Sequence, residues 1–313
     1  MRTVTILKSS SLYRDDFLIK GFAFGFGEKS LCIVGTTRGN EYQQLFVCSQ
    51  LVRELKKAEE RNQLTPGHEI LVIPCCNPSS LNVDKRFWPI DNTDINRMFP
   101  GYDLGETTQR IAYKIFETVK DYEVGVQLAS FYMPGNFLPH VLIMQTEMEY
   151  QDLATKFDVP YVVIRKPRPF DTTTLNYNWQ IWETMAFSLY TNTTDSLDPV
   201  SAARGVRSVL AFMSETGLLR DYPDSTHEYK ILYEDEDVLS LRTPSAGFFI
   251  PKVRVEDSIA QGQILANIVD PTDGEIIDEL VSPCDGTVFF MHSRPLVYSN
   301  TSAIKIIKKK APL

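Results

Sequence analysis

Histidine is scarce in this chain of 313 residues, which contains only four. Cysteine is scarce too, and the five cysteines form no CxxC pair. The sequence therefore holds few of the strong ligands that zinc takes from proteins. Five cysteines in a chain of this length also exclude a disulfide scaffold of the kind that holds small secreted domains together.

Positive charge is in deficit, and long apolar runs are missing. The 32 Lys and Arg residues face 40 Asp and Glu residues, which gives a net charge of −8. This balance argues against general nucleic-acid binding, which needs a basic face. No run approaches the roughly 20 apolar residues of a membrane span, and the N-terminus has no apolar core of signal-peptide length. We therefore expect a cytoplasmic protein with neither nucleic acid nor a membrane as partner.

The residues that are present form the pattern of an α/β domain. Hydrophobic residues make up 43% of the chain and charged residues 23%, which is typical of globular proteins. Short apolar runs alternate with segments of helical spacing, and this indicates a mostly parallel sheet flanked by helices. The predicted strands are 31–36, 69–78, 123–129, 140–146, 160–165 and 185–191, and the predicted helices are 41–64, 106–120, 149–157 and 199–218.

The pattern changes after about residue 225. From 228 to 308 the sequence has short strands separated by turn signals such as Asp273-Gly274 and Asp285-Gly286, with no helical period. We therefore predict two domains, an α/β domain over 1–225 and a small all-β domain over 226–313.

Two polar segments follow the first two predicted strands. Residues 35–41 read GTTRGNE, and residues 77–101 form a long segment rich in Asn, Asp and Pro. Ligands of open α/β sheets collect at the carboxyl ends of the strands, and long loops in compact domains are often functional. Both segments are therefore candidates for one binding site.

The second segment contains groups that suit a carboxylate. Arg86, Asn96 and Arg97 offer forked donors that match carboxylate oxygens. Alternatively, the arginines pair with Asp91 and Asp94 on a solvated loop. A single arginine fits that simpler interpretation, but the whole segment DINRMFPG beside a strand end favours a site.

These segments resemble the succinylglutamate desuccinylase/aspartoacylase family, which is related to zinc carboxypeptidases. The family motif G-x-x-H-G-[ND]-E reads GTTRGNE here, and its NP…R…D-x-NR-x-FPG motif spans residues 77–101. The D-x-H motif of a later strand reads QLA at 127–129. The resemblance extends over nearly the whole chain. It implies a zinc-carboxypeptidase-like fold with a mixed, mostly parallel sheet, followed by a barrel-sandwich β domain.

Two of the three zinc ligands that the resemblance implies are missing from this sequence. The resemblance assigns them to the His and Glu of the first motif and the His of the third, where Arg38, Glu41 and Ala129 stand here. An always-protonated guanidinium cannot ligate a cation. The family's general-base Glu aligns near Tyr190. We therefore expect no cofactor, with Glu41 as the only retained ligand position and Gln127 in place of the motif's Asp.

The ligand-holding residues of the family are present. By resemblance, Arg86 polarises the scissile carbonyl, while Asn96 and Arg97 hold the substrate carboxylate. We expect Arg38 to pair with Glu41 in the position of the metal and to contribute to anion binding.

A substitute metal site is an open alternative. Glu41 and Cys76 could provide two ligands at the same strand ends. His140 is expected to be structural at the start of its strand, and His68 is expected in a surface turn.

Two functions follow from these observations. The missing ligands favour a divergent family member that binds a carboxylate-bearing N-acyl amino acid or peptide-like ligand without zinc hydrolysis. The resemblance favours a zinc-dependent deacylase of N-acyl amino acids with a non-standard metal site. Because two of the three zinc ligands are missing, we favour binding without hydrolysis over the deacylase. The expected partners are a small carboxylate-bearing ligand and either a second copy of the chain or an active relative.

Overall fold

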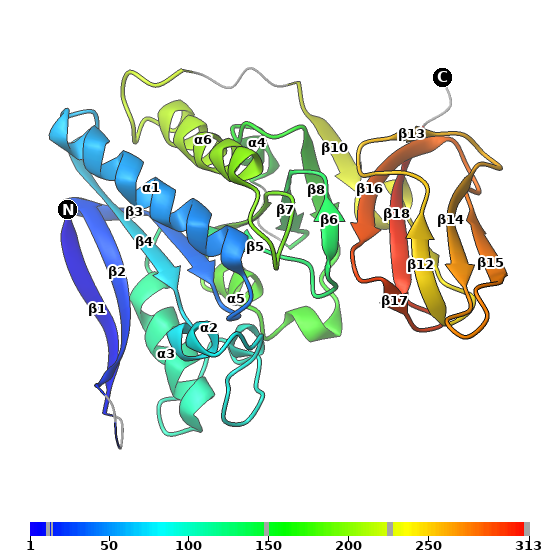
Figure 1. Ribbon diagram of the computed structural model, residues 1–313. Helices are drawn as coiled ribbons and strands as arrows, with labels where there is room; N and C mark the ends of the chain where they lie inside the picture. The colour runs from blue at the N-terminus through cyan, green and yellow to red at the C-terminus, as the bar shows by residue number, and fades with distance from the viewer. Residues whose placement is uncertain (11–12, 14, 147–149, 224–227, 310–313) are drawn as a thin grey trace. The chain divides into compact units, whose positions relative to one another are not determined.

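The computed structural model spans residues 1–313, of which all are described except 11–12, 14, 147–149, 224–227 and 310–313 (Figure 1). The chain forms two compact units. The first comprises Met1–Ser130 and Pro139–Lys230, and the second comprises Phe131–Leu138 and Ile231–Leu313. The predicted boundary at 225/226 lies outside the described residues. The second unit includes residues 131–138, which the sequence pattern had placed with the first domain.

One mixed sheet forms the centre of the first unit. Its described strands follow the order β1-β2-β4-β3-β5-β9-β7-β8-β10, and the chain passes to the second unit within β10. The strands β4, β3, β5 and β9 are parallel neighbours. The pairs β1–β2, β2–β4 and β7–β9 are antiparallel, and β7 pairs parallel with β8. The strands are β1 (Arg2–Ser9), β2 (Phe17–Gly25), β3 (Gly27–Thr36), β4 (Gly67–Cys75), β5 (Val124–Ala129), β7 (His140–Met144), β8 (Tyr161–Arg165), β9 (Met185–Tyr190) and β10 (Lys230–Tyr233).

Helices cover both faces of this sheet (Figure 1). Leu51 of α1 and Phe212 of α6 belong to one buried cluster with Ile33 of β3. Ile115 of α3 and Trp179 of α5 belong to a second cluster on the other face. The helices are α1 (Tyr42–Glu60), α2 (Pro78–Asn82), α3 (Thr107–Val119), α4 (Gln151–Ala154), α5 (Leu175–Ile181) and α6 (Pro199–Glu215), with 3₁₀ turns η1 (Ile95–Arg97) and η2 (Pro169–Asp171). The predicted α/β layering is confirmed. None of the described helices combines the length and apolar character of a membrane span.

Several elements differ from the sequence pattern. The strands β1 and β2 and the short helices α2 and α5 were not predicted. Along β1, Ile6 alone is fully buried, so this edge strand lacks the apolar run on which the prediction depended. The helix predicted over 149–157 is only the single turn α4, and residue 149 lies outside the described part.

The second unit is a sandwich of two antiparallel sheets. Its helix α7 (Glu234–Asp237) is a single acidic turn that the sequence pattern did not predict. Leu265, Val288 and Ile304 belong to one buried cluster of this unit. One sheet holds β11 (Val238–Arg242), β18 (Ser302–Lys308), β16 (Gly286–His292), β13 (Ser258–Ile259) and β6 (Gly135–Phe137), and the other holds β15 (Ile276–Val281), β14 (Ile264–Val269), β12 (Gly247–Pro251) and β17 (Leu296–Val297).

Candidate functional site

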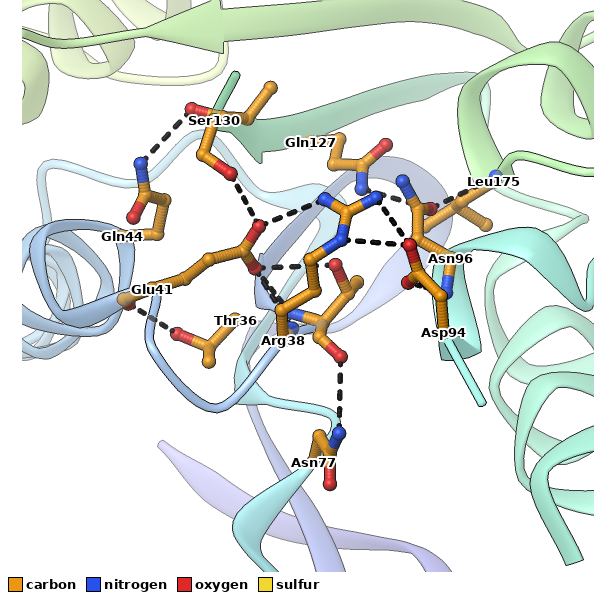
Figure 2. A network of polar contacts seen from close by, with 12 residues as sticks. Thr36, Arg38, Glu41, Gln44, Asn77, Asp94, Asn96, Gln127, Ser130 and Leu175 are labelled. Carbon is orange, nitrogen blue, oxygen red and sulfur yellow. Dashed lines mark hydrogen bonds and ion pairs between the residues drawn. The ribbon is translucent and has the colours of Figure 1, made fainter. Parts of the chain in front are cut away.

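The predicted site residues gather where the parallel strands end. The loop after β3 carries Arg38 and leads to Glu41 at the start of α1. The segment after β4 carries Asp94 and Asn96, and β5 ends at Ala129. Because β4, β3 and β5 are parallel neighbours, their carboxyl ends lie at one edge of the sheet. Segments distant in sequence thus form one polar network (Figure 2).

The carboxylate of Glu41 is buried and fully engaged. Its Oε2 accepts hydrogen bonds from Thr37 N at 2.8 Å, Thr37 Oγ1 at 3.2 Å and Arg38 N at 3.0 Å. Its Oε1 accepts from Ser130 Oγ at 2.6 Å and Arg38 Nη1 at 3.1 Å. The protein's own donors therefore surround both oxygens (Figure 2).

Arg38 bridges two carboxylates. Besides Glu41, it contacts Asp94 Oδ2 through Nε at 3.0 Å and Nη2 at 2.9 Å, and its side chain is only 7% exposed. Burial by itself lowers the pKa of Arg38, but Glu41 and Asp94 raise it above the ordinary value. The expected pair with Glu41 is present. The second partner, Asp94, was not expected, although it lies in the DINRMFPG segment that was predicted to form a site.

These residues do not fit a zinc ion. At the three family ligand positions, Arg38 brings a permanent positive charge, Ala129 has no donor atom, and the Glu41 oxygens are already hydrogen bonded. Across the described part of the chain, no group of three or more His, Cys, Asp or Glu side chains is arranged to hold a metal ion. In the substitute site, burial raises the pKa of the Cys76 thiol well above its usual value, so it is a poor ligand.

His68 and His140 lie at opposite ends of the central strands. His140 is buried, and its ring stacks on Tyr190 with the centroids 4.4 Å apart. The strand register aligns Tyr190 with Ala129 on one side and with His140 on the other. Ala129, at the third ligand position by resemblance, is therefore a neighbour of Tyr190, near which the general base aligns. His68 lies within β4, not in a surface turn, with Nδ1 2.8 Å from Ser30 Oγ.

A hydrogen-bonded chain holds Asn96 in place. Asp94 Oδ1 accepts from Asn96 N at 3.0 Å and begins the turn η1. Asn96 Oδ1 accepts from Gln127 Nε2 at 3.2 Å and Leu175 N at 3.3 Å. No local pattern in the sequence indicates the contact between Gln127 and Asn96, because it depends on the placement of β5 beside the long loop (Figure 2).

Arg86 and Arg97 are half-buried beside this network. The main-chain carbonyl of Arg86 accepts a hydrogen bond from Gly39 N at 3.0 Å. The pKa of each guanidinium is lowered, first by burial and then by the positive charge of Arg38. Arg97 Nη1 donates to the carbonyl of Phe170. The Arg86 guanidinium lies over the ring of Phe87, 5.5 Å from its centroid.

The pairing of these arginines with Asp91 and Asp94 is not observed. Asp91 accepts from Thr93 N, and Asp94 is occupied by Arg38. Within the described residues, neither Arg86 nor Arg97 forms a salt bridge with either acid.

A separate hollow of about 470 Å³ lies at the other end of the strands. Its lining includes Lys29, Asp121 and Trp182, and none of the predicted site residues. It therefore plays no part in the network around Arg38.

Comparisons with known proteins identify the family and the fold. Residues 28–187 match the model of the succinylglutamate desuccinylase/aspartoacylase catalytic domain. An N-alpha-acetyl-L-2,4-diaminobutyric acid deacetylase of Halomonas elongata is 24% identical over 260 residues, which is 77% of this chain and 70% of that protein.

Two solved structures share the fold. A succinylglutamate desuccinylase from Silicibacter sp. TM1040 has a TM-score of 0.81 at 18% identity, covering 98% of this chain and 95% of its own. The product-bound ectoine utilization protein EutE (DoeB) from Ruegeria pomeroyi has a TM-score of 0.81 at 17% identity, covering 98% of this chain and 95% of its own.

Proposed function

Because the chain belongs to the succinylglutamate desuccinylase/aspartoacylase family, we propose that it binds a carboxylate-bearing N-acyl amino acid or peptide-like ligand without zinc hydrolysis. The observation that carries the proposal is the buried Arg38 guanidinium, which bridges Glu41 and Asp94 where the family resemblance expects a metal. In this proposal, the guanidinium of Arg38 takes the place of a metal ion.

The charge of the site suits an anion. Arg38, Arg86 and Arg97 bring three positive charges, and Glu41 and Asp94 bring two negative charges, so these five groups sum to 3 − 2 = +1. Asp195 also acts on Arg86, and Asp171 and Arg165 act on Arg97. The half-buried guanidinium groups of Arg86 and Arg97 lie outside the salt bridges of Arg38. A ligand carboxylate would occupy these donors.

The comparisons support an N-acyl amino acid as the ligand class. The Halomonas elongata relative is a deacetylase of N-alpha-acetyl-L-2,4-diaminobutyric acid. In this chain, Arg86, Asn96 and Arg97 are the residues that would hold such a ligand.

The residues needed to activate water are replaced. The family's general base aligns near Tyr190, whose ring stacks on His140, and by resemblance Ala129 stands at the third ligand position. A catalytic metal normally generates the nucleophile and polarises the carbonyl, so its loss removes both contributions. We therefore assign binding, not hydrolysis, to the site.

Calorimetry combined with product analysis tests this proposal. Protein purified without chelator is titrated with N-acetyl-L-aspartate, with and without EDTA, and free acetate is followed by NMR. We expect binding that EDTA does not change and no acetate release. Arg97→Ala should weaken binding about tenfold or more, because a charged hydrogen bond is lost.

The matched control is Arg53→Ala. Arg53 is an exposed arginine of α1 that pairs only with its neighbour Glu54 in the described structure, so its removal should leave the affinity unchanged. Acetate release that disappears on chelation would overturn the proposal in favour of a deacylase with a non-standard metal site. Absence of binding at millimolar ligand would also overturn it.

A further inference from the structure

The chain crosses from the first unit to the second beside the buried carboxylate. The first unit is interrupted after Ser130 and resumes at Pro139, and residues 131–138 belong to the second unit. Ser130 is buried, and its Oγ donates to Glu41 Oε1 at 2.6 Å, the shortest of the five hydrogen bonds to that carboxylate (Figure 2). The last residue before the crossing is therefore a member of the polar network.

The sheet of the first unit holds the residue that precedes Ser130. Ala129 is the last residue of β5 and pairs with Tyr190 of β9. Its carbonyl oxygen also accepts a hydrogen bond from Gln44 Nε2 at 3.0 Å. These contacts fix the main chain on one side of Ser130, so the position of Ser130 depends on what holds the residue on its other side.

That residue, Phe131, is anchored in the second unit. Its ring meets the ring of Phe137 edge-to-face with the centroids 4.8 Å apart, and that of Phe290 with the centroids 5.2 Å apart. The Lys305 ammonium group lies 5.2 Å from the centroid of the Phe131 ring. Edge-to-face aromatic pairs and cation–π contacts both stabilise such an arrangement. Phe131 thus contacts β16 and β18, which carry Phe290 and Lys305.

The rest of segment 131–138 adds a strand to the same sheet. Strand β6 pairs antiparallel with β16, and Phe137 lies opposite Phe290. At Gly135 the two strands approach so closely that a Cβ atom would lie 2.4 Å from Met291 O. Any larger residue at position 135 would therefore push β6 away from β16.

We propose that Phe131 is a positioning residue, whose anchoring in the second unit holds Ser130 against Glu41. The packing of β6 on β16 then controls how fully the buried carboxylate is engaged. Consecutive Cα atoms are only about 3.8 Å apart, and a hydrogen bond is lost once its heavy atoms separate beyond about 3.5 Å, so a shift of Phe131 by about 1 Å is enough to withdraw Ser130. The inference goes beyond the proposed function, because it concerns the network and not the ligand.

Two main-chain amides report how firmly Glu41 is held. Without Ser130, Glu41 Oε1 keeps Arg38 as its one donor among the described residues. The carboxylate can then turn, which weakens the hydrogen bonds that Oε2 accepts from Thr37 N and Arg38 N. Because amides exchange with solvent when their hydrogen bonds open, the exchange of these two amides should quicken.

Hydrogen exchange of the Thr37 and Arg38 amides, followed by NMR on the full chain, tests the inference. Ser130→Ala removes the donor and should speed exchange about tenfold, because a hydrogen bond to a charged group is lost. Gly135→Ala should speed the same two amides, although residue 135 lies outside the network. In the double variant, Gly135→Ala should add nothing to Ser130→Ala, since both changes act through Ser130. A merely structural loss would add to it.

Gly247→Ala is the matched control. Gly247 lies in β12, in the other sheet of the second unit, and a Cβ atom there would lie 2.5 Å from Val269 O. This variant should destabilise the second unit in the same way. It should nevertheless leave the exchange of Thr37 and Arg38 unchanged, because it does not displace β6.

If Gly135→Ala fails to fold, Phe131→Leu provides the test, because it keeps an apolar side chain but removes the ring contacts. Unchanged exchange in these variants, or equal acceleration in Gly247→Ala, overturns the role of Phe131. Unchanged exchange in Ser130→Ala overturns it as well, because Ser130 would then not hold Glu41. No ligand enters these measurements, so their failure leaves the proposed function standing, and calorimetry tests that function separately.

Discussion

At the scale of single residues, Arg38 decides the chemistry of the site. Its side chain is buried between Glu41 and Asp94, and the three groups form a compact ionic network. Removing one partner of a buried ion pair leaves the other charge uncompensated, which costs more than the pair itself contributes.

Replacing Arg38 therefore tests the network. Arg38→Met should lower the free energy of unfolding by about 3 kcal/mol, because two carboxylates lose their counter-ion. Urea denaturation followed by circular dichroism measures the change. Arg53→Met, at a side chain that is 62% exposed, should cost less than about 1 kcal/mol. Equal losses in the two variants would contradict the importance of the buried network.

The residues with functional roles were largely visible in the sequence, but their partners were not. Arg38, Glu41, Arg86, Asn96 and Arg97 all belong to recognisable motifs. The roles that the resemblance gives to Arg86, Asn96 and Arg97 stay predictions. The pairing of Arg38 with Asp94 joins residues 56 positions apart, so no local pattern indicates it.

At the scale of elements, close packing between β5 and α5 fixes the start of β5, the strand whose other end carries Ala129. A Cβ atom on Gly125 would lie 2.7 Å from Trp179 Cδ2. The indole Nε1 of Trp179 also donates to Val119 O at 3.2 Å, which ties α5 to the end of α3. The ring therefore has little freedom to move aside.

Gly125→Ala should destabilise the protein by about 1–3 kcal/mol through overpacking. Chemical denaturation measures the loss in the free energy of unfolding. A double variant that also carries Trp179→Leu relieves the clash, so its loss should be smaller than the sum of the two single losses. Strictly additive losses would show that the indole can shift without cost.

The helices and strands were predicted accurately where the apolar pattern was continuous. The buried central strands β3, β4, β5 and β9 and the long helices α1, α3 and α6 were found close to their actual bounds. The hairpin β1–β2 and the helix α5 were missed because their sequences mix polar and apolar residues. Their positions depend on packing against the sheet, which local sequence does not encode.

At the scale of the whole molecule, the acidic balance limits the partners. The net charge of −8 opposes non-specific attraction to phosphate backbones. The cytoplasmic location and the association with a second copy or an active relative remain predictions.

The net negative charge predicts that the protein does not bind duplex DNA. In gel-shift experiments at physiological salt, duplex DNA should migrate unchanged with increasing amounts of the protein. Neutralising contacts with phosphates would instead produce a shift that weakens steeply as salt is raised. Such a salt-dependent shift would reveal a local basic surface that overrides the net charge.

The sequence by itself determined the family and the α/β architecture, because motifs and apolar runs are contiguous in the chain. That Arg38 and Ala129 stand at ligand positions of the family stays a prediction. Only the tertiary structure decided which groups these polar side chains contact. The bridge from Glu41 through Arg38 to Asp94 and the contact of Gln127 with Asn96 join separate segments. The alignment of Ala129 with Tyr190 depends on strand register. Strand order sets these distances, and separation along the chain does not.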